Sequence, residues 1–191
     1  MRIVIDLGHG GPDRGNVHNG IEEADLVESV GFNLVAHLTL AGHEVTVTRD
    51  QTRDPTPGER DRVAREFDAS FVLSIHADAQ PHGGTDWRGS TSFYWRSNHR
   101  TGLVASDIAE TMPRQLKKSA MGRVHGLAAD DTSYPRAVNV VAPFTPPTVL
   151  VELGYLTNAR DAEYLGTALA ADRIVAALFA GCTRAAELYG G

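Results

Sequence analysis

Three ionisable side chains stand near the ends of three predicted buried strands. His9 follows the apolar run 3–5 and lies among glycines, His76 follows the run 70–75, and Glu152 stands one residue before the end of the run 148–153. Because parallel strands bring their carboxyl ends to one edge of a sheet, we expect these side chains to converge in one crevice. Two imidazoles and a carboxylate suit zinc, and three protein ligands leave a fourth position for water.

A further ligand is expected close to His9 in the chain. Residues 20–25 open a predicted helix and contain three acids, Glu22, Glu23 and Asp25. Acids in a first helical turn also complement the helix dipole, so for Glu22 and Asp25 a purely structural role is an equal alternative. A lone histidine is more often a core residue than a ligand, and it is the convergence of several groups that favours a metal site.

The elements that must position these residues follow from apolar periodicity. Predicted strands cover 2–6, 43–48, 70–75, 90–95 and 148–153, with shorter strand-like pieces at 124–127 and 138–141. Predicted helices cover 22–41, 57–67 and 100–116, and a last helical region follows Asn158 and reaches Phe179. This alternation predicts an α/β fold: a three-layer αβα arrangement with a mainly parallel twisted sheet of about six strands and helices on both faces.

Composition narrows the classes of function. The chain has 191 residues, 42% of them hydrophobic, and a net charge of -6, which predicts a single domain over 1–191 without a basic stripe for nucleic acid. No apolar run is long enough to insert into a membrane. Cys182 is the one cysteine, so it is expected to be a buried, inert thiol and a cysteine-based zinc site is excluded. No signal peptide is visible after Met1, and we expect a monomer.

The residues also carry a resemblance to a known family. The chain resembles the zinc-dependent N-acetylmuramoyl-L-alanine amidases of the amidase-3 type, over Arg2 to about Phe179. The family motif D-x-G-H-G-G-x-D-x-G is matched by Asp6–Gly15, and G-x-x-E is matched by Gly20–Glu23. A T-R-x-x-D motif is matched in part by Thr48, Arg49 and Asp50. Three further motifs are matched with one change each: Arg65 replaces Asn after Arg60 and Ala64, Asp78 replaces Asn in Ser74–Asp78, and Tyr155 replaces Phe in Pro147–Asn158.

The resemblance implies a set of roles. His9, Glu23 and His76 would bind one Zn²⁺ per chain, with Glu23 rather than Glu22 at the ligand position. Glu152 would be the catalytic carboxylate, the alternative being a fourth, structural ligand. The implied reaction is hydrolysis of the amide between N-acetylmuramic acid and L-alanine in peptidoglycan.

Other functions remain open alternatives. They are another zinc peptidoglycan peptidase, such as a carboxypeptidase on the same fold, and a non-catalytic cell-wall-binding protein. A dinucleotide-binding loop is set aside because residues 8–13 lack the G-x-G-x-x-G spacing. A compact domain without a leader is the layout expected of a phage endolysin, or of a domain excised from an exported autolysin.

Several further residues are candidates for supporting roles. Asp6 and Asp13 are expected to orient His9 without binding the metal themselves. Trp87, Tyr94 and Trp95 would face a substrate groove or, as the more frequent alternative, belong to the core, and His125 is the histidine to test first as a substrate contact. Residues 113–141 contain no long amphipathic helix with an acid aimed at the metal, which predicts an open site.

Overall fold

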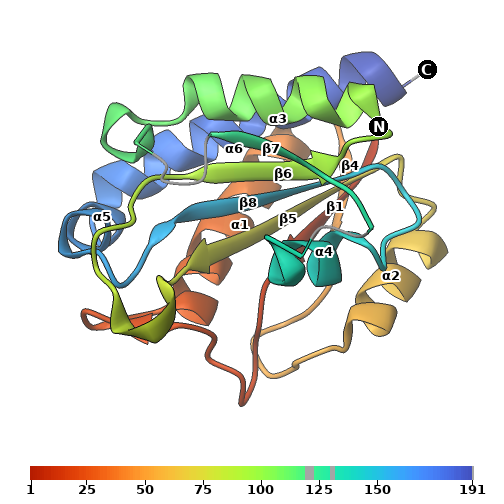
Figure 1. Ribbon diagram of the computed structural model, residues 1–191. Coiled ribbons are helices and arrows are strands. Elements are labelled where there is room, and N and C mark those ends of the chain that lie inside the picture. The colour runs from red at the N-terminus through yellow and green to blue at the C-terminus, as the bar shows by residue number, and fades with distance from the viewer. Residues whose placement is uncertain (119–122, 130–131, 191) are drawn as a thin grey trace.

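One sheet of six strands organises the computed structural model, which describes residues 1–118, 123–129 and 132–190 (Figure 1). The strands are β1 (Arg2–Leu7), β4 (Glu44–Val47), β5 (Phe71–Asp78), β6 (Thr91–Trp95), β7 (Val124–Leu127) and β8 (Thr148–Tyr155). Their order across the sheet is β4-β1-β5-β8-β6-β7. All neighbours are parallel except β6 and β8, so the predicted mainly parallel sheet is confirmed.

Helices cover both faces of the sheet and make three layers (Figure 1). One face packs against α1 (Glu23–Leu40), α3 (His99–Thr111) and α6 (Ala168–Tyr189), and the other against α2 (Pro57–Glu66) and α4 (Pro135–Val141). The side chains of β1 divide between the faces because they alternate. Ile3 and Ile5 enter the large core beneath α1, α3 and α6, whereas Val4 packs against Ala64 of α2.

Local sequence explains where the helices begin. The Thr56 hydroxyl accepts a hydrogen bond from the Glu59 backbone, and the Glu59 carboxylate accepts one from the Thr56 backbone at 2.8 Å. Pro57 occupies the first helical position, so the predicted start of α2 is confirmed. In α1 the fully buried residues recur at helical spacing, as expected for a helix with one apolar face: Val27, Val30, Leu34 and Leu38.

Three parts of the chain differ from the predicted elements. Residues 138–141 belong to helix α4 and not to a strand, because Pro135 starts a helical turn there. The predicted helix over 100–116 ends at Thr111, since Pro113 interrupts it before a short 3₁₀ turn, Arg114–Leu116. The last helical region is two helices, α5 (Ala159–Leu165) and α6, separated at Gly166 and Thr167.

A two-stranded hairpin, β2 (Val17–His18) with β3 (Ile21–Glu22), also lies between β1 and α1. Each of its strands has only two residues, too short to give the alternating pattern by which strands are recognised in a sequence.

Both chain ends lie at one end of the sheet (Figure 1). The Tyr189 ring near the C-terminus stacks on Phe71, the first residue of β5, with ring centroids 6.3 Å apart. Among the described residues, no single helix is long and apolar enough to cross a membrane, although α5 and α6 pass that test together while bent by 86°.

Candidate metal centre and active site

The three predicted metal ligands meet where β1 ends and α1 begins, beside β5. The Nε2 atom of His9 lies 3.2 Å from Glu23 Oε2, and the Nδ1 atom of His76 lies 3.1 Å from Glu23 Oε1. Each of the three residues offers one candidate ligand atom, and these three atoms all lie within 4.8 Å of one another. His9 follows β1, Glu23 is the first residue of α1 and His76 lies in β5, so three separate elements supply the cluster.

Glu23 is buried and fixed by hydrogen bonds from the backbone and from one amide side chain. Its Oε1 atom accepts from the Ala77 N–H at 2.9 Å, and its Oε2 atom accepts from the Asn16 N–H at 2.9 Å and Nδ2 at 2.8 Å. Burial raises the pKa of this carboxyl, but its bonds with His76 and His9 outweigh burial and hold the pKa well below its usual range. Asn16 is not among the predicted site residues, since a single Asn in a glycine-containing loop carries no distinguishing pattern.

The neighbouring acids take a different role. Glu22 and Asp25 both pair with the Arg14 guanidinium on the outside of α1. The structure therefore separates Glu23 from the other two acids of the segment by burial and direction.

His9 is held between two carboxylates. Its Nδ1 atom lies 2.7 Å from Asp13 Oδ2, and the backbones of Gly10 and Asp13 pair in a short bridge that keeps Asp13 beside the ring. Burial lowers the pKa of His9, but the Glu23 and Asp13 carboxylates outweigh it and raise the pKa to about 9. Asp13 thus lies where the sequence predicts support for His9.

Two glycines leave room for the ligand side chains. A Cβ atom on Gly8 would lie 2.5 Å from Cε1 of His76. A Cβ atom on Gly15 would lie 2.6 Å from Cδ2 of His9 and 2.7 Å from Glu23 Oε2, and the φ of Gly15 is +67°. These close approaches explain the glycine-rich loop by the packing of the cluster itself.

Asp6 supports His9 only indirectly. Its buried carboxylate accepts hydrogen bonds from Thr48, Ser74 and Arg60, and it has no contact with the His9 ring among the described residues. Arg60 in turn donates to the His9 carbonyl at 2.9 Å. Burial raises the pKa of Asp6, but the Arg60 guanidinium and the two hydroxyls outweigh burial and lower it.

A second buried arginine ties the ends of two elements together. Arg49 donates to the carbonyls of Leu7 at 3.1 Å, Gly8 at 3.0 Å and Ala24 at 3.3 Å, and pairs with Glu28 at 3.0 Å. The loop that carries His9 is thereby joined to the first turn of α1, which carries Glu23.

Glu152 faces the cluster from the adjacent strand. In the parallel pairing of β5 with β8, Glu152 lies opposite His76. Its Oε2 atom is shielded from solvent and has no hydrogen-bond partner within the described parts of the chain. Burial raises the pKa of Glu152 well above its usual range, and Asp78 and Glu23 add to this, whereas Arg136 opposes it.

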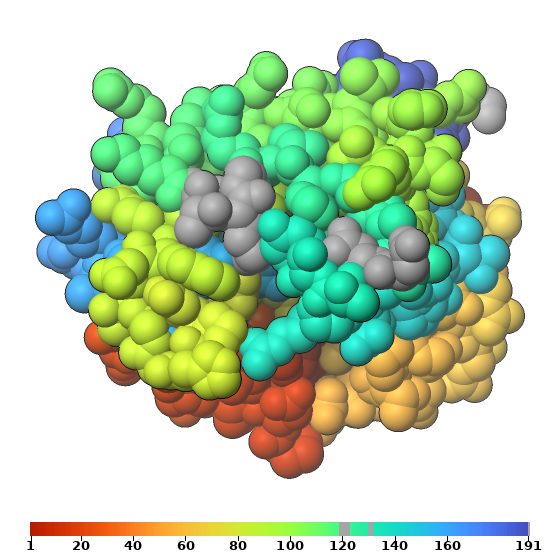
Figure 2. Space-filling view, in the orientation of Figure 1, coloured from red at the N-terminus to blue at the C-terminus, as the bar shows by residue number. Residues whose placement is uncertain are grey.

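A hollow of about 430 Å³ joins these residues. Its lining includes all four predicted site residues, His9, Glu23, His76 and Glu152. Arg136 and Asn139 of α4 also line it, so this short helix forms one wall. Figure 2 shows α4, in turquoise, and the yellow-green segment around residues 80–89 meeting the red N-terminal segment on one face of the molecule.

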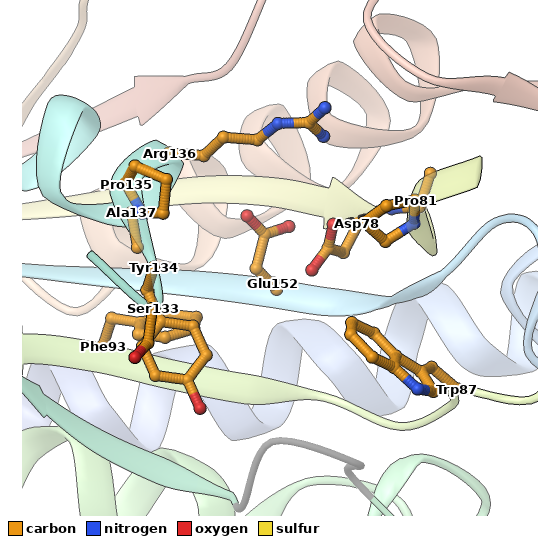
Figure 3. Close-up of a pocket in the computed structure, with 11 residues that line it drawn as sticks. Asp78, Pro81, Trp87, Phe93, Ser133, Tyr134, Pro135, Arg136, Ala137 and Glu152 are labelled. Atoms are coloured by element: carbon orange, nitrogen blue, oxygen red, sulfur yellow. Dashed lines mark hydrogen bonds between the residues drawn. The ribbon is translucent and has the colours of Figure 1, made fainter. Parts of the chain in front are cut away.

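A second cavity of about 190 Å³ adjoins Glu152 (Figure 3). Trp87, Phe93 and Tyr134 line its apolar part. Of the predicted aromatic residues, Trp87 therefore borders the site, whereas Tyr94 and Trp95 pack against the cores. His125 is not among the lining residues of this cavity, but its ring packs against that of Tyr134, with the ring centroids 4.1 Å apart.

The sequence predicts that no helix within residues 113–141 places an acid over the site. Within this segment α4 borders the hollow, and it carries no acidic residue. Residues 119–122 and 130–131 lie outside the described residues. The openness of the site stays a prediction.

The chain is similar in sequence and in fold to proteins of one known family. The family model described as N-acetylmuramoyl-L-alanine amidase, Amidase_3, matches residues 3–184. The chain is 27% identical to the germination-specific N-acetylmuramoyl-L-alanine amidase of Bacillus subtilis, over 95% of this chain and 78% of that protein. It is 29% identical to an endolysin of Bacillus phage SPP1, over 85% of this chain and 58% of the endolysin. The solved amidase AmiC2 of Nostoc punctiforme has a TM-score of 0.81 at 25% identity, over 98% of this chain and 97% of that one.

Proposed function

Because the chain belongs to the Amidase_3 family of N-acetylmuramoyl-L-alanine amidases and hydrolyses amide bonds of peptidoglycan, we propose that it does so with zinc held by His9, Glu23 and His76. Glu152 is the proposed catalytic carboxylate. The bond cleaved joins N-acetylmuramic acid to L-alanine. The observation that carries the proposal is the meeting of three ligand side chains and one unpartnered carboxylate oxygen on a single hollow.

The residues present fit a zinc ion. Two imidazole nitrogens and one carboxylate are a donor set that zinc takes in catalytic sites, with one position left for water. Hydrogen bonds from Asn16 and Ala77 favour the ionised form of Glu23 that a metal requires. His9 bonds through its second nitrogen to Asp13, as metal-bound histidines commonly do. We propose one zinc ion per chain.

When bound, zinc supplies a Lewis acid that polarises a carbonyl oxygen and makes water more acidic. The protein supplies the proton transfers. Glu152 accepts a proton from the attacking water at its carboxylate and returns it to the departing amine of L-alanine. A carboxyl whose pKa lies above its usual range can both accept and return a proton, and burial raises the pKa of Glu152 above that range.

The test is product analysis on purified peptidoglycan. The parent protein should release intact stem peptides with a free L-alanine amine, leave the glycan chains unbroken, and contain one zinc per chain by elemental analysis. Release of a single terminal amino acid would instead indicate a carboxypeptidase. A zinc-free protein that binds cell wall without releasing peptides would indicate a binding module.

The cellular setting of the enzyme is also a proposal. It acts on the cell wall as a monomer, with residues 1–191 as one catalytic domain and without binding nucleic acid or inserting into a membrane. The similarity to a phage endolysin supports release from the producing cell, and the similarity to a germination amidase supports wall remodelling. Light scattering after gel filtration measures the oligomeric state, and lysis of cells treated from outside measures wall access.

A further inference from the structure

One fixed cation stands among the acids of the two cavities. Arg136 lines both the hollow of about 430 Å³ and the adjoining cavity of about 190 Å³. The other residues of the two linings that can carry a charge near neutral pH are Asp13, Glu23, Asp78, Glu152 and the histidines His9 and His76. Among the described residues that line these two cavities, the guanidinium of Arg136 is therefore the only permanently positive group.

The position of Arg136 is set by a packed helix. Ala137 and Val141 of α4 are buried against Phe93 and Leu150 of the sheet. Figure 3 shows Arg136 leaving α4 on the side of the site where the Glu152 carboxylate points. The helix thus holds the base of this side chain at the rim of both cavities.

The guanidinium is exposed and keeps its donors available. No hydrogen bond or ion pair of the Arg136 side chain is found within the described ranges of the chain. In contrast, the guanidinium groups of Arg49 and Arg60 donate hydrogen bonds to backbone carbonyls and carboxylates beneath the site. Arg136 is therefore free to bind a ligand, and a planar guanidinium forms paired hydrogen bonds with a carboxylate.

The charge of the hollow indicates why such a contact is needed. Four carboxylates line the two cavities. The proposed zinc ion would offset the charge of its ligand Glu23, but Asp78 and Glu152 line both cavities outside that ligand set and disfavour an anionic substrate group beside them unless a cation is close by. The peptide stem of peptidoglycan carries free carboxylates close to the bond that an amidase cleaves. We infer that Arg136 binds the stem carboxylate nearest the cleaved amide and thereby selects stems in which this group is not amidated. This inference rests on the proposed function and names the part of the substrate that α4 recognises.

Binding is tested without turnover, in the Glu152→Gln background. The probes are two muramoyl tripeptides, both with an amidated C-terminus, whose second residue carries either a free or an amidated α-carboxylate. Calorimetry should show about fivefold to tenfold tighter binding of the free form, as one charge-assisted contact provides. Adding Arg136→Gln should abolish this preference, and Arg136→Lys should retain part of it. Arg173→Gln, an exposed arginine on α6 across the sheet, should leave the preference unchanged.

Steady-state kinetics in the active protein separate this role from an effect on Glu152. Arg136→Gln should raise KM for the free form several-fold and leave kcat nearly unchanged. A preference that persists in Arg136→Gln, an absence of binding to both probes, or an equal loss of kcat with both would overturn the inference. If the parent releases no stem peptides from peptidoglycan, it is the proposed function that fails.

Discussion

The Nδ1 atom of His9 lies 2.7 Å from the Oδ2 atom of Asp13, so the opposite ring nitrogen is the one that faces Glu23. A carboxylate in this position fixes both the orientation of the ring and the nitrogen that carries its proton. The backbone bridge between Gly10 and Asp13 makes this contact a property of the loop. The loop therefore holds the His9 ring in one defined orientation, with Nε2 toward Glu23.

Asp13→Ala should weaken zinc binding by about 10- to 100-fold, the usual effect of removing such a partner. The fold should persist, because the Asp13 side chain is 47% exposed and lies outside the cores. Competition with a chromogenic chelator measures the zinc Kd, and Asp172→Ala on the surface of α6 serves as the control. An unchanged Kd in Asp13→Ala would show that the contact does not position His9 for a metal.

Gly8→Ala should lose zinc, because the added methyl group would overlap the His76 ring. Displacement of that ring removes one of three ligands, so the metal content should fall by more than half while far-ultraviolet circular dichroism stays unchanged. Gly58→Ala is the matched control, since its Cβ would meet no atom within 4 Å. As an alanine inside α2, it should be neutral or stabilising by about 0.5–1 kcal/mol. Full zinc content in Gly8→Ala would contradict the packing argument.

Glu152→Gln should lower kcat by about 10²- to 10⁴-fold and leave the zinc content intact. Glutamine keeps the size of the side chain but cannot accept the proton of an attacking water. Release of soluble stem peptides gives the rate and elemental analysis gives the metal content, with Glu163→Gln at an exposed position of α5 as the control. Retained zinc with full lytic activity would remove Glu152 from the mechanism.

Asp6→Asn should destabilise the protein at pH 7 by about 3 kcal/mol, because Arg60 keeps its buried charge without its partner. The pKa of Asp6 is lowered in the folded protein, so its contribution is complete above the unfolded pKa of about 3.9 and is lost as the pH falls through the lower folded value. The difference between parent and variant should therefore shrink below about pH 4. Urea unfolding between pH 3 and 7 measures it, and a difference that stays constant with pH would contradict this account.

Much of the site is predictable because its residues sit at strand ends. The alternation of strands and helices predicts a parallel sheet whose carboxyl ends share one edge, and His76 and Glu152 lie on neighbouring parallel strands at that edge. His9 lies beside a glycine that ends its strand. The choice of Glu23 over Glu22 came only from the family motif, since burial decides between them and a run of acids does not reveal which one turns inward.

The remaining parts of the site depend on long-range contacts. Arg49 and Arg60 are buried beneath the His9 loop, although isolated arginines in a polar segment and in an amphipathic helix are normally exposed. Residues 138–141 are apolar and β-branched enough to suggest a strand, yet they form the end of α4, because packing against Phe93 and Leu150 overrides local preference. Neither the burial of these two arginines nor the packing of α4 on the sheet can be predicted from the periodicity of the sequence.

The shared location of the two chain ends has a practical consequence for engineering. Met1 and Tyr189 lie beside the amino ends of β1 and β5, whereas His9 and His76 of the proposed metal site lie at the carboxyl ends of the same strands. A tether, an affinity module or a surface anchor fused at either terminus therefore leaves from the side opposite the proposed site. Such fusions can immobilise the enzyme on a support while the edge that meets the wall polymer stays unobstructed.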